Sequence, residues 1–120
     1  MKLLWKRIRQ LEIKNDINQT KMELYAVLIP TILSTEIFKR NRDIKELVDC
    51  LKFKNAVKDY LYISRTALVA RIVREIELSE DVELNENLEM FRGKALEIID
   101  KIEIIDSSEV TKFINKYSRN

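Results

Sequence analysis

The sequence of 120 residues contains no histidine and a single cysteine, Cys50. Histidine is the commonest general base and zinc ligand in proteins, so its absence removes the most frequent routes to acid–base catalysis and to a zinc site. Cys50 cannot form a disulfide within the chain, and such sparing use of cysteine is typical of a reducing, cytoplasmic setting. We therefore expect no enzyme activity, no metal, no cofactor and no small-molecule substrate.

Glycine and proline occur only once each. Turns in sheets and long loops rely on these two residues, whereas helix interiors avoid them. Hydrophobic residues make up 46% of the chain and charged residues 35%, which is enough for one core and a well-solvated surface. The sequence thus predicts an all-α fold, in which residues 1–120 form one domain: a compact bundle of five or six helices with short connections.

No uncharged apolar run is long enough to cross a bilayer. The longest one, residues 24–33, contains Pro30, whereas a spanning helix needs about 20 apolar residues. It therefore predicts a buried core helix that is kinked or restarted at Pro30. The first eleven residues predict a basic amphipathic helix with Trp5 at the rim of its apolar face. Such a helix can lie on an anionic membrane, but more often it packs on its own domain, so we expect no membrane partner.

The net charge of +2 is unevenly spread along the chain. Residues 1–74 hold 16 Lys and Arg against 8 Asp and Glu, whereas residues 75–109 hold 3 against 12. Opposite fields on one small domain favour head-to-tail self-association or separate acidic and basic binding faces. The alternative is that the acidic segment folds back on the basic one and neutralises it.

Local signals predict several helix starts. Residues 20–23 (TKME) match a capping box, and Ser34 is expected to cap a short turn. Ser64 is expected to cap a further helix. Asp106 followed by Glu109 predicts the start of a last helix, with apolar residues Val110, Phe113, Ile114 and Tyr117.

The clearest periodic pattern lies in the acidic part of the chain, where apolar residues alternate at spacings of four and three over three heptads. Gly93 within this helix predicts the close approach of another backbone. Two alternatives stay open for the seam: the other helices of the domain fill it, or it pairs with a second copy or with a partner's helix. Its members are Leu84, Leu88, Phe91, Ala95, Ile98, Ile102 and Ile105.

Residues 53–76 have the outline of a helix-turn-helix DNA reader: a helix ending near Tyr62, a tight junction, and a second helix opening at Ser64. Arg65 would reach base edges while the helix N-terminus faced a phosphate. The turn lacks the usual glycine, and Ser-Arg-Thr is also an ordinary helix start, so a purely structural interpretation stays open. Arg71 is also expected to pair with Glu75 on an exposed face. The candidate nucleic-acid contacts are Lys54, Lys58, Ser64, Arg65, Thr66 and Arg71.

These patterns predict a non-enzymatic interaction protein. It would be a small regulator or inhibitor that docks a helical face on another protein, either as a monomer or as a homodimer, with charge complementarity setting the orientation. A DNA-binding transcriptional regulator that uses residues 53–76 is the alternative.

Overall fold

The structure is a computed structural model that describes the backbone of residues 1–117 and the side chains of residues 1–103. Over these residues every regular element is a helix and none is a strand, so the predicted all-α bundle is confirmed. The elements in order are α1 (Lys2–Arg9), α2 (Ile17–Leu33), the 3₁₀ helix η1 (Asn41–Ile44), α3 (Lys45–Val48), the 3₁₀ helix η2 (Asp59–Ile63), α4 (Arg65–Glu77) and α5 (Asp81–Tyr117).

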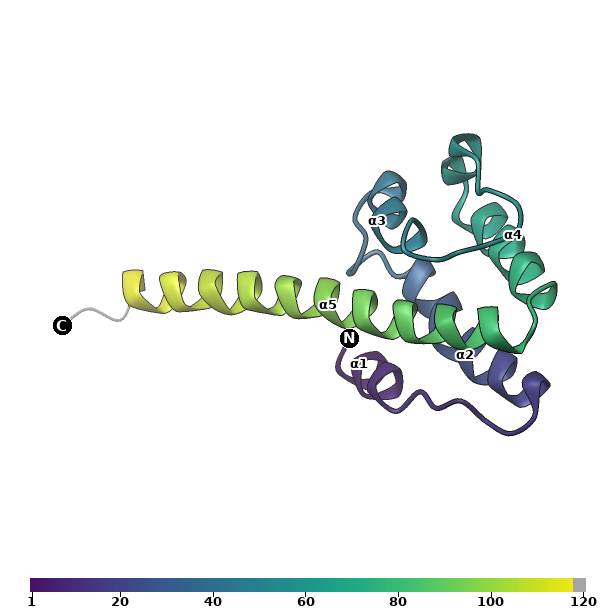
Figure 1. Ribbon diagram of the computed structural model, residues 1–120. Helices are drawn as coiled ribbons and strands as arrows, with labels where there is room; N and C mark the ends of the chain where they lie inside the picture. Colours follow the sequence, from purple (N-terminus) through teal and green to yellow (C-terminus); the bar gives the residue numbers. More distant parts are fainter. Residues whose placement is uncertain (118–120) are drawn as a thin grey trace.

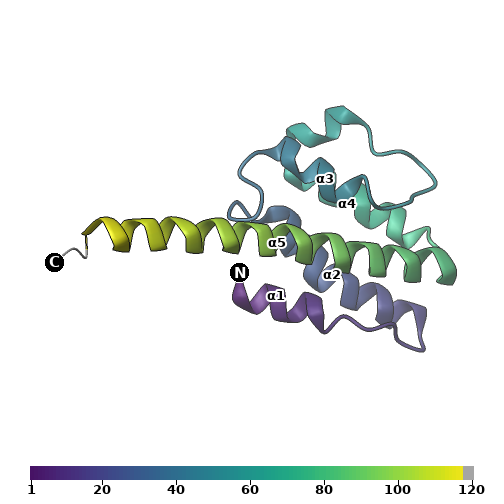
Figure 2. The same cartoon turned by 60° about the vertical axis from the view of Figure 1, so that its left-hand side comes forward.

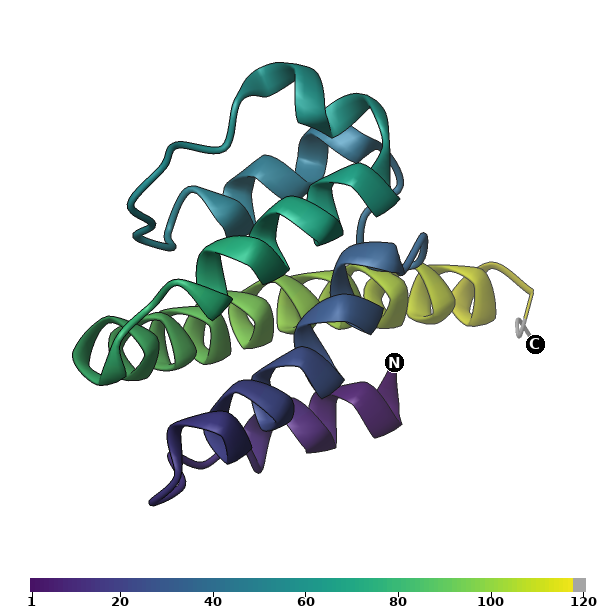
Figure 3. The same ribbon diagram turned by 90° about the vertical axis from the view of Figure 1, so that its right-hand side faces the viewer.

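Helix α5 is the element around which the others are arranged. In Figures 1 and 2, α1 lies below α5, and α3 and α4 lie above it. Helix α2 crosses between these two groups and contacts α1, α4 and α5; Figure 3 shows it between α1 below and α4 above. The side chains between them form a single hydrophobic core, whose most buried members include Ile8, Leu28, Ile44, Leu68, Ile72, Leu88 and Phe91.

The basic helix α1 packs on the acidic helix α5. Ile8 is fully buried, and the Trp5 Nε1–H group donates a hydrogen bond of 3.0 Å to the Asp100 carboxylate. The Arg9 guanidinium lies over the Trp5 ring, 4.9 Å from its centroid. This packing brings the first basic segment alongside part of the acidic one. In the described part of the chain, no helix has the length and hydropathy needed to cross a membrane.

Two of the predicted helix caps are confirmed. The Ser34 hydroxyl accepts a hydrogen bond of 3.2 Å from the backbone N–H of Ile37, which closes a short turn. The Ser64 hydroxyl accepts one of 3.3 Å from the backbone N–H of Ala67 at the start of α4. Each serine therefore satisfies an amide that its helical turn leaves without a partner.

The predicted capping box at residues 20–23 is wrong. Helix α2 begins one turn earlier, where the Asp16 carboxylate accepts from the backbone N–H of Asn18 at 3.1 Å. Thr20 lies inside the helix and is buried, and its hydroxyl accepts from the backbone N–H of Lys14 at 2.9 Å. The threonine thus fixes the incoming chain against the helix instead of capping it. Pro30 lies inside the last turn of α2 and does not start a new helix.

Two predicted boundaries are also wrong. The α-helix expected to end near Tyr62 is absent: α3 ends at Val48, and residues 51–58 form an irregular segment before η2. The buried Asn87 side chain holds this segment by bonding both the N–H and the C=O of Lys52 at 2.8 Å. The helix start expected at Asp106 is absent, because the backbone of α5 continues through that position without a break.

Gly93 does not mark a close contact. It lies exposed within α5, and a Cβ atom built on it would meet nothing within 4 Å. The expected close approach of another backbone is therefore wrong for this chain, and the glycine leaves α5 with an avoidable entropy cost at that position.

Gly93→Ala should therefore stabilise the protein by about 1 kcal/mol, since alanine lowers the backbone entropy cost of the helix and meets no neighbour. Urea denaturation measures this as a higher midpoint at unchanged slope. Ala70→Gly, at an exposed position of α4, is the matched control and should lower stability by a similar amount. A less stable Gly93→Ala variant would contradict the open surroundings of this residue.

Candidate interaction surface

The heptad seam is buried inside the bundle over its first five residues, whereas its last two residues are not shown to be buried. Leu84, Phe91 and Ile98 are 1%, 0% and 8% exposed, and Leu88 and Ala95 are equally buried. The other helices of the chain cover these five side chains, which corresponds to the internal alternative for residues 84–98. Ile102 is only partly buried. Ile105 lies outside the residues whose side chains the structure describes.

Beyond the bundle, the backbone of α5 continues as a projecting helix. Figures 1 and 2 show α5 leaving the other elements, and among the described residues no other helix lies beside its far end. The helix has 37 residues, which corresponds to about 55 Å. Near the base of this projection, the Trp5 indole of α1 donates a hydrogen bond to Asp100 of α5. We call residues 101–117 the α5 tail.

Four apolar residues in the last two turns of the α5 tail lie near the side of the helix that carries the buried Ile99. Val110 and Tyr117 follow the fully buried Ile99 by 11 and 18 residues, or about three and five turns, so all three fall on one side of α5. Phe113 and Ile114 flank this line and complete a tail stripe. The tail stripe consists of Val110, Phe113, Ile114 and Tyr117.

Sequence reasoning found the residues of the tail stripe but not their relation to the core. It placed a helix start at Asp106, which separated them from the seam. Because α5 is continuous, the same side of one helix first faces its own core and then extends past it. Asp106 itself follows Ile99 by seven residues, about two turns, so a carboxylate interrupts the stripe.

The base of the tail carries a cluster of paired charges. Lys94 lies 3.2 Å from both Glu97 and Glu46, and Lys101 lies 3.3 Å from Glu97. Hydrogen bonds from Lys94 and then Lys101 hold the pKa of Glu97 below its ordinary value. These exposed pairs contribute little to stability, but they keep a charged rim where the tail leaves the bundle.

The residue most needed for DNA reading, Arg65, is engaged inside the protein. Its Nε donates to the Asn41 side chain at 2.8 Å, and its Nη1 donates to the carbonyls of Ile32 and Ser34 at 3.1 and 3.0 Å. Its Nη2 bonds to the Phe38 carbonyl. The guanidinium thus closes the end of α2 and the turn that follows, and it does not point to solvent.

The other DNA candidates do not form the predicted element. Residues 53–58 are not helical, so the first helix of the helix-turn-helix outline is wrong. Lys54 and Lys58 lie exposed on the irregular segment, whereas Ser64 caps α4, with its hydroxyl 3.0 Å from that of the exposed Thr66.

The pairing of Arg71 with Glu75 differs from expectation in its burial. The Glu75 side chain is only 1% exposed, so the predicted exposed pair is wrong. Arg71 Nε lies 3.5 Å from Glu75 Oε1, and the backbone N–H of Asn55 donates to Glu75 Oε2 at 3.4 Å. A buried carboxylate needs such a positive neighbour, because an isolated charge is costly in the interior. Arg71 is therefore committed to a structural role.

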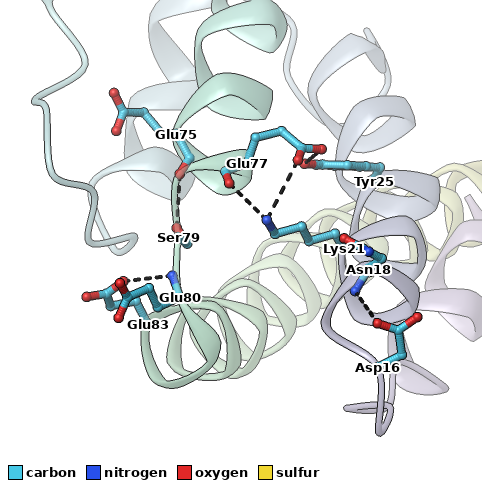
Figure 4. A network of polar contacts seen from close by, with 9 residues as sticks. All are labelled: Asp16, Asn18, Lys21, Tyr25, Glu75, Glu77, Ser79, Glu80 and Glu83. Carbon is cyan, nitrogen blue, oxygen red and sulfur yellow. Dashed lines mark hydrogen bonds and ion pairs between the residues drawn. The ribbon is translucent and has the colours of Figure 1, made fainter.

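A second basic side chain closes the end of α4. Figure 4 shows Lys21 reaching from α2, where its Nζ donates to the Glu77 carbonyl at 2.9 Å and lies 3.7 Å from the Glu77 carboxylate. The Tyr25 hydroxyl donates to the same carboxylate at 2.7 Å. Burial, followed by this hydrogen bond, raises the pKa of Tyr25. The cluster joins two helices and leaves no reactive group facing a cavity.

The remaining polar features favour structure over chemistry. Burial raises the pKa of the Cys50 thiol, which donates to the Leu47 carbonyl, so the thiolate needed for nucleophilic attack is disfavoured. A cleft of about 210 Å³ lies between residues 52–54 and the junction of α4 with α5. Within the described residues, no group of three or more His, Cys, Asp or Glu side chains is placed to hold a metal ion.

No known protein family matches the chain, and no curated protein or solved structure is significantly similar to it. Its function must therefore be inferred from its own residues.

Arg65→Ala should destabilise the fold by about 3 kcal/mol, since it leaves a set of carbonyl oxygens without their charged donor. Arg65→Lys should recover only part of this loss, because a single ammonium cannot reproduce the guanidinium fork. Chemical denaturation measures both, with the exposed Lys54→Ala as a charge-matched control that should leave stability unchanged. Full stability of Arg65→Ala together with lost affinity for duplex DNA would restore the DNA-reading interpretation.

Proposed function

We propose that this chain is a non-enzymatic interaction protein whose α5 tail binds a helical segment of a protein partner. The observation that carries the proposal is the continuity of α5. Its apolar side is buried in the core at Ile99 and partly buried at Ile102. The sequence places further apolar residues, Val110 and Tyr117, on the side of Ile99 where the backbone projects past the bundle.

The physical argument concerns what such a helix requires in water. An isolated helix is marginally stable, and most helical stability in proteins comes from burying an apolar face. The tail stripe presents two aromatic and two aliphatic residues within eight positions. Their burial against a partner would remove a substantial apolar area from water, which is the main driving force of association.

The kind of partner follows from the shape of the surface. A single projecting helix offers a ridge of side chains at helical spacing, and such ridges pack into the groove of another helix or helix pair. By occupying a partner's helix in this way, the chain would act as a small regulator or inhibitor. The charged cluster around Lys94, Glu97 and Lys101 lies where it would orient an incoming segment.

DNA binding is the weaker proposal for this chain. Arg65 and Arg71 hold internal groups, and the expected first helix is an irregular segment. Such binding would have to rest on exposed lysines and would fall steeply with rising salt.

The tail-binding proposal predicts that Phe113→Asp abolishes partner capture and leaves the bundle folded. A charge in the stripe would have to lose its hydration when a partner binds, which is costly. The bundle should stay folded, because residues other than Phe113 form the core that the structure describes. The measurement is affinity capture from the producing cells, followed by mass spectrometry, with circular dichroism as the check on folding. Asn115→Asp is the matched control, because it adds the same charge about half a turn away from the stripe.

A protein retained by the wild type and by Asn115→Asp, but lost with Phe113→Asp, would support the proposal. Identical capture by all three chains would overturn it, since the tail stripe would then make no difference to binding.

A further inference from the structure

We infer that the outer side of α2 binds α2 of a second copy of this chain, packed antiparallel to the first. The inference does not rest on the proposed function, because it concerns a different helix and no residue of the α5 tail. It is carried by an uncharged apolar stripe on the outer side of α2 and by a hollow that lies beside this stripe.

Helix α2 is apolar on its outer side as well as in the core. Met22 is 68% exposed and Leu33 is 43% exposed, and the exposed Ala26 and half-buried Ile29 lie between them. At about 100° of rotation per residue, these four side chains fall within about 60° of one another. In Figure 3, α2 passes in front of α5, and no other element of the described chain lies over it. We call these four residues the α2 stripe.

No charged side chain interrupts the α2 stripe. The charged residues of α2 are Lys21, which is buried, and Glu23, which lies about 100° away from Met22 around the helix. Single exposed apolar residues are common on protein surfaces, whereas a continuous apolar patch marks a surface that another molecule covers. The stripe is about 17 Å long, so a partner helix of three turns matches it.

The shape of α2 favours a second copy as that partner. A hollow of about 280 Å³ lies beside the first half of the stripe, lined by Lys14, Asn18, Gln19, Met22 and Glu23. Leu33 projects at the other end of the same stripe. In an antiparallel pair centred between positions 27 and 28, Leu33 of each copy lies against Met22 of the other, beside the hollow. The two-fold axis makes this contact twice, so one helix supplies both the projecting side chain and the hollow that receives it.

The centre of the pair fits the same register. Ala26 lies opposite Ile29, and its small side chain lets the two helices approach closely. The two Glu23 carboxylates are then about 14 Å apart along the pair, beyond the screening length of about 8 Å in physiological salt. A parallel pair would instead set Leu33 against Leu33 and leave both hollows unfilled. The interface involves one helix of each chain, so the dimer is a reversible one.

Sedimentation equilibrium of the full chain tests the second copy as partner. The wild type should dimerise reversibly, and Met22→Asp should weaken the dimer by about 100-fold, because the two-fold axis places two charges in the apolar contact. Leu33→Asp should have a similar effect. Met90→Asp is the matched control, since it makes the same substitution at an exposed position of α5 and should leave the equilibrium unchanged. Circular dichroism verifies that each variant is folded.

Cysteine cross-linking tests the orientation. Met22→Cys and Leu33→Cys chains, each also carrying Cys50→Ser, are oxidised separately and as a mixture. The antiparallel pair places position 22 beside position 33, so the mixture should form a disulfide-linked dimer about tenfold faster than either chain alone. Cross-linking of the separate chains as fast as the mixture would overturn the antiparallel arrangement.

The failure of this inference is distinguishable from that of the proposed function. A wild-type chain that stays monomeric at millimolar concentration, or a Met22→Asp dimer as tight as that of the wild type, overturns pairing through α2. Phe113→Asp should leave the dimer intact, because the α5 tail takes no part in it. Loss of the dimer with Phe113→Asp but not with Met22→Asp would move the contact to the tail and overturn the inference, whereas the capture experiment reports on the tail alone.

Discussion

The constraint on which this structure depends is the need to satisfy the backbone carbonyls at its helix ends with almost no glycine. Helices commonly end on a glycine in the left-handed conformation, which turns the chain and lets the last carbonyls find partners. Here no residue of the described backbone has a positive φ. The carbonyls at the ends of α2 and α4 are instead satisfied by Arg65 and Lys21, long basic side chains that reach across from neighbouring elements.

Lys21, Arg65 and Arg71 are engaged with groups of the protein itself, whereas most other lysines and arginines of residues 1–74 are exposed. Arg65 ties α4 to the end of α2, and Lys21 ties α2 to the end of α4, so each helix helps to terminate the other. Asn87 likewise satisfies backbone groups of the irregular segment, since its side chain bonds both the N–H and the C=O of Lys52. The number of lysines and arginines in the sequence therefore overstates the positive charge at the surface, because a few of these side chains bond groups of the protein itself.

The elements with strong periodicity could be predicted from the sequence, and those fixed by contacts over long separations could not. Helix α4 and its Ser64 cap follow from local hydrogen bonding, which sequence spacing reveals. The segment 51–58 has helical spacing of apolar residues, but Asn87, which lies 35 residues away from Lys52, holds it in another conformation. No local pattern contains that information.

The errors at the ends of helices have a common physical origin. Asp16 and Thr20 both have side chains that cap helices, and the choice between them depends on where the preceding chain lies. Asp106 followed by Glu109 resembles a helix start, yet the same residues are tolerated within a helix whose backbone bonds are already formed. Capping motifs therefore indicate where a helix can begin, and they do not require that it does.

The location of the candidate surface follows from the distribution of apolar residues along α5, between the bundle and the α5 tail. In the bundle, α1, α2 and α3 contact α5, whose side chains are fully buried at Ile99 and partly buried at Ile102. The backbone of α5 continues past these residues, and Val110 and Tyr117 fall on the same side of the helix as Ile99. We propose that a helical segment of a partner buries this repeat, since most of a helix's stability in water comes from covering its apolar face.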